Sequence, residues 1–239
     1  MKIKFLGTGQ METARKNTSF VVDNNILFDI GNGVLDSLIE NELDTKDIDF
    51  VIISHLHTDH FGDIVYFLHR RRMKDGFDKK LTIIGPIDTK QKICTLNELT
   101  MPDVIEDVEK TMNIDFVELK DKLYQNKLFE LKAFSVVHGP TDCNGYIITK
   151  DKLSLGYSGD SSFCDSLVEN IKFANTWFIE ANDLEEMKNY HVGLNQLQDL
   201  ALKNKTKKFY TIHRKDYAIR KEVQNLYFPN DKEIVFIKK

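Results

Sequence analysis

The sequence has 239 residues, which is enough to bury a large core as one domain or as two smaller ones. Its hydrophobic share of 41% and its charged share of 29% are those of a folded globular protein and exclude a disordered chain. The formal net charge of -4 excludes a global attraction to nucleic acid, so any contact with a polyanion needs a local basic patch.

The first half of the chain alternates between strand and helix signals. Short apolar runs bounded by Gly, Pro or Asn predict strands at residues 3–6, 19–23, 26–29, 50–53 and 81–84. The pair Asn24-Asn25 predicts a hairpin between the second and third of these strands. Patterned apolar residues predict helices at 34–40, 61–72, 88–99 and 103–112.

The second half continues in the same style. Strands are predicted at residues 114–118, 128–137, 146–149, 153–158, 177–180, 209–212 and 234–237, and helices at 163–171, 194–203 and 217–226. No linker rich in Pro, Gly or Ser separates the halves, so we expect a single domain over residues 1–239. Two strand-rich halves with interspersed helices favour two sheets packed face to face, with helices on the outer faces.

Three histidines and an aspartate lie in the six residues His55-Leu56-His57-Thr58-Asp59-His60, directly after a predicted buried strand. If that strand ends near residue 54, the side chains at 55 and 57 project from the same side of a nearly extended segment. One short loop can then offer ligands to two adjacent cations. Imidazole and carboxylate together suit zinc, with manganese or iron as alternatives. The alternative origin is three surface histidines that are close by accident.

Three further polar side chains follow strand-like runs: His138, Asp160 and His213. Loops at strand ends, held by a rigid frame, are where sites are commonly built. Each residue also has a structural interpretation: a loop histidine, a helix cap near residue 162, and packing beside Phe209.

The order of these residues resembles the metallo-β-lactamase superfamily of hydrolases, and within it the ribonuclease Z and phosphodiesterase branch. Supporting stretches extend over nearly the whole chain: Phe5-Leu6-Gly7-Thr8-Gly9, Lys16-Asn17-Thr18-Ser19, Leu27-Phe28-Asp29-Ile30-Gly31-Asn32-Gly33, Gly145-Tyr146-Ile147-Ile148 and Tyr157-Ser158-Gly159-Asp160. The resemblance implies an α+β fold, a four-layer αββα sandwich of two mixed sheets flanked by helices, with the site at one edge of the sheets.

The resemblance also implies two divalent metal ions, with Zn²⁺ expected first and Mn²⁺ or Fe as alternatives. One ion would be held by His55, His57 and His138. The other would be held by Asp59, His60 and His213, with Asp160 bridging the pair. Such a centre leaves a position for a bridging hydroxide as nucleophile.

Residues outside this set also resemble the family's pattern. Asp29 corresponds to an acid that supports the ligand histidines, with a turn cap beside Asn32 as the alternative. His191, together with acidic residues such as Glu180, is a candidate proton donor or phosphate contact, although Val-Gly-Leu follows it instead of the family's small polar residues and acid. The alternative for His191 is a solvated loop histidine. We count Asp59 and His191 as candidate catalytic residues.

One basic run, residues 69–74, ends the helix predicted at 61–72. Cations suit the C-terminal end of a helix, so we expect a solvated face, with contact to a phosphate backbone as the alternative. Between residues 62 and 81 there is no long insertion like the arm with which many ribonuclease Z proteins grip tRNA.

These observations predict a metal-dependent hydrolase, first of all a phosphodiesterase or ribonuclease Z-like nuclease whose substrate is a small phosphodiester or RNA. The first alternative is hydrolysis of a thioester, lactone or β-lactam on the same metals. Redox chemistry at di-iron is disfavoured because His57 stands where such relatives tend to carry glutamate. A non-catalytic metal-binding or scaffold protein is disfavoured because all seven candidate ligands are present.

The three cysteines, Cys94, Cys143 and Cys164, form no paired motif. The start of the chain has no apolar region typical of a signal peptide, and no apolar run is long enough to cross a bilayer. We therefore expect reduced thiols, a cytoplasmic location and no membrane partner. Homodimers are common in the branch that the chain resembles, so a homodimer is a further expectation.

Overall fold

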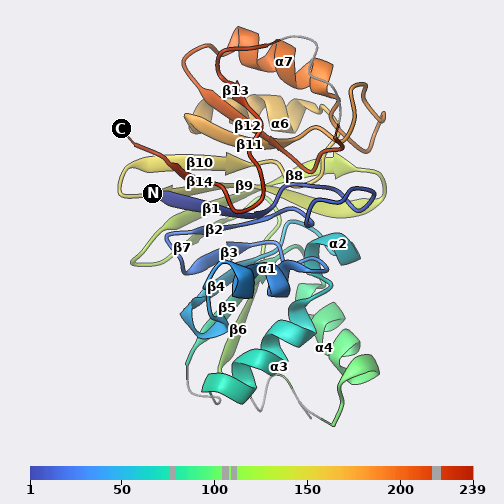
Figure 1. Cartoon of the computed structure of the whole chain (residues 1–239), viewed down its shortest axis with the longest axis vertical. Coiled ribbons are helices and arrows are strands. Elements are labelled where there is room, and N and C mark those ends of the chain that lie inside the picture. The colour runs from blue at the N-terminus through green and yellow to red at the C-terminus, as the bar shows by residue number, and fades with distance from the viewer. Residues whose placement is uncertain (76–78, 104–107, 109–111, 217–221, 239) are drawn as a thin grey trace.

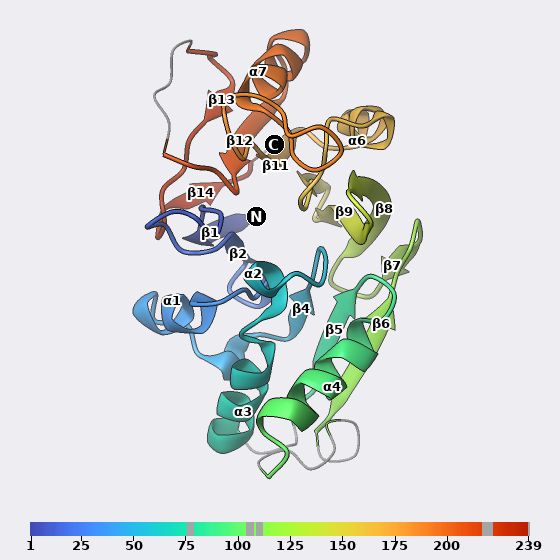
Figure 2. The ribbon, with the colours of Figure 1, turned by 90° about the vertical axis from the view of Figure 1, so that its right-hand side faces the viewer.

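The computed structural model describes residues 1–75, 79–103, 108, 112–216 and 222–238. Within these residues the strands form two seven-stranded sheets that pack face to face, and helices cover both outer faces (Figures 1 and 2). This is the predicted α+β sandwich of four αββα layers. No helix in the described part of the chain is long and apolar enough to span a bilayer.

The first sheet has the strand order β14-β1-β2-β3-β4-β5-β6. Its strands are β1 (Lys2–Gly7), β2 (Ser19–Val22), β3 (Ile26–Phe28), β4 (Phe50–Ile52), β5 (Leu81–Gly85), β6 (Ile114–Glu118) and β14 (Ile234–Phe236). Pairing is antiparallel from β14 to β3 and parallel from β3 to β6. The helical segments on this side are α1 (Val34–Glu40), η1 (Thr45–Asp47), α2 (Thr58–Phe61), α3 (Ile64–Asp75) and α4 (Thr89–Thr100).

The second sheet has the order β13-β12-β11-β10-β9-β8-β7. Its strands are β7 (Leu123–Gln125), β8 (Glu130–His138), β9 (Thr141–Lys150), β10 (Leu153–Tyr157), β11 (Thr176–Glu180), β12 (Lys208–Ile212) and β13 (Leu226–Tyr227). Pairing is antiparallel from β7 to β10 and parallel from β10 to β13. The outer face carries α6 (Asp165–Asn170), η2 (Ile171–Phe173) and α7 (Leu194–Lys203).

Aromatic side chains from both sheets form the central core. The ring centroids of Phe5 and Phe178 lie 4.9 Å apart, and those of Phe20 and Tyr157 lie 5.3 Å apart. These rings are almost fully buried, and each contributes on the order of 1.5–3 kcal/mol of hydrophobic stabilisation. The two sheets are therefore held firmly together, which fixes the positions of their strand ends.

The direction of the strands brings distant parts of the sequence to one edge. Parallel strands β3 and β4 of the first sheet end at the same edge, and so do β10, β11 and β12 of the second. Strand β8 runs in the same direction as β10 because both are antiparallel to β9. Residues that follow these six strands can therefore meet at this edge of the sandwich.

One predicted helix is divided in the structure, and another cannot be compared with it. The helix predicted at 61–72 is interrupted, because Asp63 separates α2 from α3 and accepts a hydrogen bond from the Leu35 backbone N–H at 3.0 Å. The helix predicted at 103–112 lies largely outside the described residues. Strand β7 was not predicted, because its three residues, Leu-Tyr-Gln, form no apolar run and are exposed or half-buried.

The helix predicted at 217–226 is wrong over its described part, while residues 217–221 lie outside the described residues. The side-chain amide of Asn225 donates hydrogen bonds to the backbone carbonyls of Ala201, Asn204 and Lys207 at 2.9–3.1 Å. The Asn225 carbonyl also accepts a bond from Phe209 N–H at 2.8 Å. These bonds hold the segment beside β12, where it forms β13 instead of a helix.

The solvated face predicted for the basic run is wrong at Arg71, whose side chain is 1% exposed. The Arg71 guanidinium donates to the backbone carbonyls of Ile48 at 2.7 Å and Lys80 at 3.1 Å. Arg71 therefore ties α3 to the segments that lead into β4 and β5.

Candidate metal centre

The first predicted ligand set comes together although His138 is distant in sequence from the other two histidines. His57 Nδ1 lies 3.1 Å from His55 Nε2 and 3.2 Å from His138 Nε2. His55 and His138 are buried and His57 is exposed, so the set opens toward solvent on one side. His138 Nδ1 donates to the Tyr190 carbonyl at 3.0 Å, which leaves Nε2 to face the other two rings.

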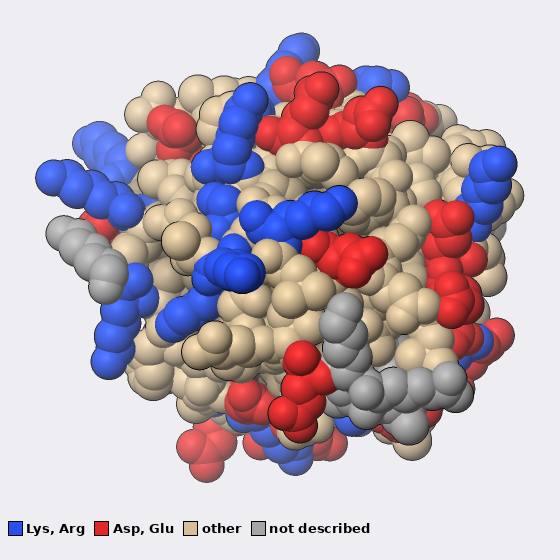
Figure 3. All heavy atoms as spheres, turned by 90° about the horizontal axis from the view of Figure 1, so that it is seen from above, with Lys and Arg blue, Asp and Glu red and all other residues tan. Residues whose placement is uncertain are grey.

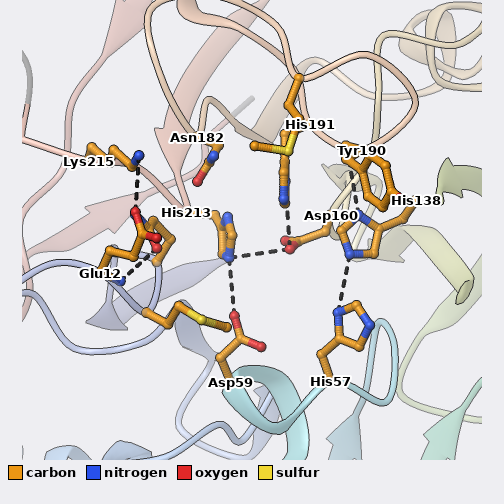
Figure 4. A pocket seen from close by; sticks show the side chains of 13 residues that line it. Glu12, His57, Asp59, His138, Asp160, Asn182, Tyr190, His191, His213 and Lys215 are labelled. Carbon is orange, nitrogen blue, oxygen red and sulfur yellow. Dashed lines mark hydrogen bonds and ion pairs between the residues drawn. The ribbon is translucent and has the colours of Figure 1, made fainter.

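The second predicted set lies next to the first. Its members Asp59, His60, Asp160 and His213 offer ligand atoms that are all within 4.8 Å of one another. His213 Nε2 is 3.4 Å from Asp59 Oδ2 and 3.3 Å from Asp160 Oδ2. Figure 4 shows Asp59, Asp160 and His213 pointing toward one another from separate segments of the chain. Asp160 also lies 4.0 Å from His55 Nε2, so its carboxylate stands between the two sets.

Several polar atoms of this cluster are buried without a hydrogen-bond partner in the described structure: Asp59 Oδ1, His60 Nε2 and Asp160 Oδ1. An unsatisfied buried polar atom costs about 1–3 kcal/mol, and more when it is charged. A divalent cation among these atoms would remove that cost. Imidazole and carboxylate donors in groups of three or four are the ligands that zinc prefers, so the residues fit the metal that the sequence predicts.

The electrostatics of the second set also favour positive charge. Burial lowers the pKa of His60, but Asp160 and Asp29 outweigh burial and raise it well above its usual value. Burial opposes protonation of His213 as well, yet Asp160, Asp59 and Glu180 raise its pKa to about 10. Despite its burial, Asp160 has a pKa well below the usual range because of His213 and His60. A metal cation placed here would supply the charge that the carboxylates stabilise.

Asp29 directly follows β3 and contacts His60 of the second set on the side of the ring that faces away from the other ligand atoms. Its Oδ2 accepts hydrogen bonds from His60 Nδ1 at 2.8 Å and from Tyr157 Oη at 2.5 Å. The carboxylate also accepts bonds from the Ser54 backbone N–H at 2.6 Å and from the Ser54 hydroxyl at 2.8 Å. These contacts hold the His60 ring with Nε2 toward Asp59 and Asp160, as the resemblance implied.

The backbone is unusual at the same place. Asp29 and His213 both adopt left-handed conformations, with φ of 53° and 47°. Such conformations are uncommon for residues other than glycine, and strain of this kind concentrates at functional sites. At Gly31, an added Cβ would lie 1.7 Å from the Asp59 carbonyl oxygen, so only glycine permits the loop after β3 to approach α2.

His191 lies beside the two candidate ligand sets and is not a solvated loop residue. Its Nδ1 is 2.8 Å from Glu180 Oε2 and 3.9 Å from Asp160 Oδ2, and its side chain is 15% exposed. Glu180 is buried at the end of β11 and also accepts the Ser161 N–H at 2.5 Å. Burial lowers the pKa of His191, but the hydrogen bond and the charge of Glu180 outweigh burial and raise it.

A cleft of about 290 Å³ opens over the cluster. Besides the histidines and aspartates described above, its lining includes residues that the sequence did not point to: Gln10, Met11, Glu12, Asn182, Met187, Tyr190 and Lys215. They lie in the loops that follow β1, β11 and β12. The sequence singles out His191 and His213 in these loops, and closeness to them in the chain is the signal that could have pointed to Tyr190 and Lys215.

Known proteins resemble this chain in sequence. The Ribonuclease Z of Staphylococcus saprophyticus is 31% identical over 150 residues, which is 58% of this chain and 46% of that protein. The chain thus spans about half the length of the first curated relatives that it matches. A family model described as "Anti-Pycsar protein Apyc1" matches residues 1–238.

Solved structures share the fold. The short form of human tRNase Z has a TM-score of 0.80 at 20% sequence identity, with 100% of both chains covered. A diphosphatase from the PhnP family has a TM-score of 0.75 at 17% identity, covering 99% of this chain and 98% of the other. These structures show the fold that the resemblance implied, and the sequence relatives are named as members of the predicted ribonuclease Z-like branch.

Proposed function

The chain belongs to the family of the anti-Pycsar protein Apyc1, and on that premise we propose that it is a metal-dependent phosphodiesterase. The observation that carries the proposal is the pair of adjoining ligand sets, with buried oxygen and nitrogen atoms that lack hydrogen-bond partners among the described residues. Relatives named ribonuclease Z and tRNase Z support phosphodiester chemistry over the carbonyl alternatives.

In this proposal each ligand set holds one divalent cation, most simply Zn²⁺. His55, His57 and His138 form one set. Asp59, His60 and His213 form the other, with Asp160 shared because its oxygens lie 3.3–4.0 Å from ligand nitrogens of both sets. When bound, two such cations supply a nucleophilic oxygen at neutral pH and stabilise the charge that develops on the phosphoryl oxygens.

His191 would give a proton to the leaving oxygen. Its Nδ1 is held by Glu180 at 2.8 Å, so Nε2 is the nitrogen available to a substrate in the cleft. The pKa of His191 is raised because Glu180 outweighs burial, which favours the protonated ring that an acid catalyst needs. Glu180 would position the ring and stabilise its charge.

A small phosphodiester fits the cleft better than a long RNA. The volume of the cleft, about 290 Å³, is at the lower end for ligand sites. On the face that carries α7, the described Lys and Arg side chains lie together with acidic and uncharged ones (Figure 3). RNA nevertheless stays the second candidate, because the curated relatives are named Ribonuclease Z. A homodimer, a cytoplasmic location and a single domain over residues 1–239 stay predictions.

The test is a substrate panel with the zinc-loaded protein: bis-p-nitrophenyl phosphate, a pre-tRNA with a 3′ trailer, a p-nitrophenyl thioester and a lactone. The proposal predicts turnover of the diester and slow or no turnover of the carbonyl substrates. Asp160→Asn should abolish this turnover, whereas His69→Ala, a histidine outside the cluster, should not affect it. Turnover of the carbonyl substrates alone would reject phosphodiester chemistry, and a protein without zinc would reject the metal centre.

A further inference from the structure

Two charged side chains that line the cleft, Glu12 and Lys215, form a cluster with the neighbouring Asp183, which we call the rim bridge. Lys215 Nζ lies 3.1 Å from Glu12 Oε2 and 3.3 Å from Asp183 Oδ2. The bridge connects the loops that follow β1, β11 and β12, and Figure 4 shows the Lys215 ammonium directed at Glu12 beside the cleft.

Lys215 is fixed to the site by its backbone. It follows His213 by two residues, and its N–H donates to the Asn182 carbonyl at 3.2 Å. Among the described residues that line the cleft, Lys215 is the single Lys or Arg, whereas Glu12, Asp59 and Asp160 are acidic. It is thus the one side chain there with a permanent positive charge to offer an anionic substrate.

The two ion pairs of the rim bridge are exposed enough to be exchanged. The exposed fractions of the side chains are 35% for Lys215, 67% for Glu12 and 50% for Asp183. Exposed ion pairs are weak because water screens them, so a phosphate oxygen can compete for the ammonium. An ammonium has three donors, of which the two carboxylates take two.

We propose that Lys215 binds a non-reacting oxygen of the phosphodiester, and that Glu12 and Asp183 compete with the substrate for the same ammonium. This inference rests on the proposed function. Lys215 is then a specificity residue for anionic substrates, and the two acids weaken substrate binding in the unmodified chain. Like-charge repulsion between these carboxylates and the substrate acts in the same direction.

A purely structural bridge predicts a different pattern. If the cluster only held the three loops together, removing the acids would damage the site as much as removing the lysine. The two interpretations therefore predict opposite changes in KM for the double variant Glu12→Gln, Asp183→Asn, which removes both acids and keeps Lys215.

The experiment measures kcat and KM for bis-p-nitrophenyl phosphate at low salt with the zinc-loaded protein. Lys215→Gln should raise KM about 3- to 10-fold with little change in kcat, as expected for loss of one charge-assisted contact. The double variant should lower KM about 2- to 5-fold below that of the unmodified chain. Lys80→Gln, which breaks the exposed pair with Asp115 at 2.6 Å, is the matched control and should leave KM unchanged.

An unchanged KM in Lys215→Gln, or a raised KM in the double variant, would overturn the inference. Failure of the unmodified chain to hydrolyse the diester would instead refute the proposed function. In that case calorimetric titration of inorganic phosphate into the same zinc-loaded proteins still shows whether Lys215 binds a phosphate anion. The inference predicts the tightest phosphate binding in the double variant and the weakest in Lys215→Gln, and any other order contradicts it.

Discussion

Replacing Asp29 by Asn tests whether this buried carboxylate orients the metal cluster. The carboxylate accepts hydrogen bonds from the Ser54 N–H, the Ser54 hydroxyl, His60 Nδ1 and Tyr157 Oη, all within 2.8 Å. An amide keeps one acceptor oxygen and adds a donor. With that oxygen in the place of Oδ2, the new donor faces the Ser54 N–H. Asn tolerates the left-handed backbone at this position, so the change is confined to the side chain.

The magnitude follows from these contacts. One buried donor left unsatisfied costs about 1–3 kcal/mol, which we expect as the loss of unfolding free energy of the metal-free Asp29→Asn protein in urea. Loss of the carboxylate behind a ligand histidine typically weakens metal binding by about 10–100-fold, so zinc affinity measured by chelator competition should fall by at least about tenfold.

Tyr157→Phe is the matched control, because it removes one donor to the same carboxylate oxygen and leaves the Asp29–His60 contact in place. It should cost about 1 kcal/mol of stability and leave zinc affinity within a factor of about three. Equal zinc affinities of Asp29→Asn and Tyr157→Phe would refute the role assigned to Asp29.

Three further predictions follow from individual contacts. His191→Ala should lower kcat on the diester by about 10²-fold or more with full metal content, and unchanged turnover would remove its role as proton donor. Gly31→Ala would place a Cβ 1.7 Å from the Asp59 carbonyl oxygen and should destabilise the protein by about 1–3 kcal/mol or more in urea unfolding; wild-type stability would contradict this close approach. Burial raises the pKa of Asp23, but the Lys150 ammonium, 2.6 Å away, and a backbone N–H outweigh burial and lower the pKa below its usual 3.8. The ionised Asp23 carboxylate therefore stabilises the folded protein above pH 3.8. Asp23→Asn should therefore cost a few tenths of a kcal/mol near neutral pH, discounted for partial exposure, and this difference should vanish as the pH falls below 3.8 through the folded pKa; a constant difference in acid would exclude the linkage.

The convergence of the His/Asp cluster was predicted from the sequence mainly through its resemblance to a known family, because each member taken alone also has a structural interpretation. The residues from His55 to His60 follow β4 after two intervening residues, and His138, Asp160 and His213 each end or follow a strand. The sequence pattern alone supports only a mixed α and β fold, and the four-layer sandwich and the ligand candidates were both implied by the resemblance. Their convergence within 4.8 Å in each set is what the strand directions produce.

Other contacts depend on tertiary packing and left little trace in the sequence. Arg71 reads as part of a basic surface run, yet its guanidinium is buried against backbone carbonyls that it meets only in the folded chain. Asn225 breaks a predicted helical pattern through bonds to three distant carbonyls. Lys215 belongs to no local sequence motif. Its ion pairs are with Glu12 and Asp183, which lie in other loops and are distant from it in the sequence.

Anomalous diffraction at the zinc edge, from crystals grown with zinc, tests the metal centre most directly. We predict two adjacent peaks, one among His55, His57 and His138, and the other among Asp59, His60 and His213, with Asp160 touching both. A map without a peak in this cleft, or with His138, Asp160 and His213 turned away from the loop that carries His55 and His60, would contradict the proposed centre.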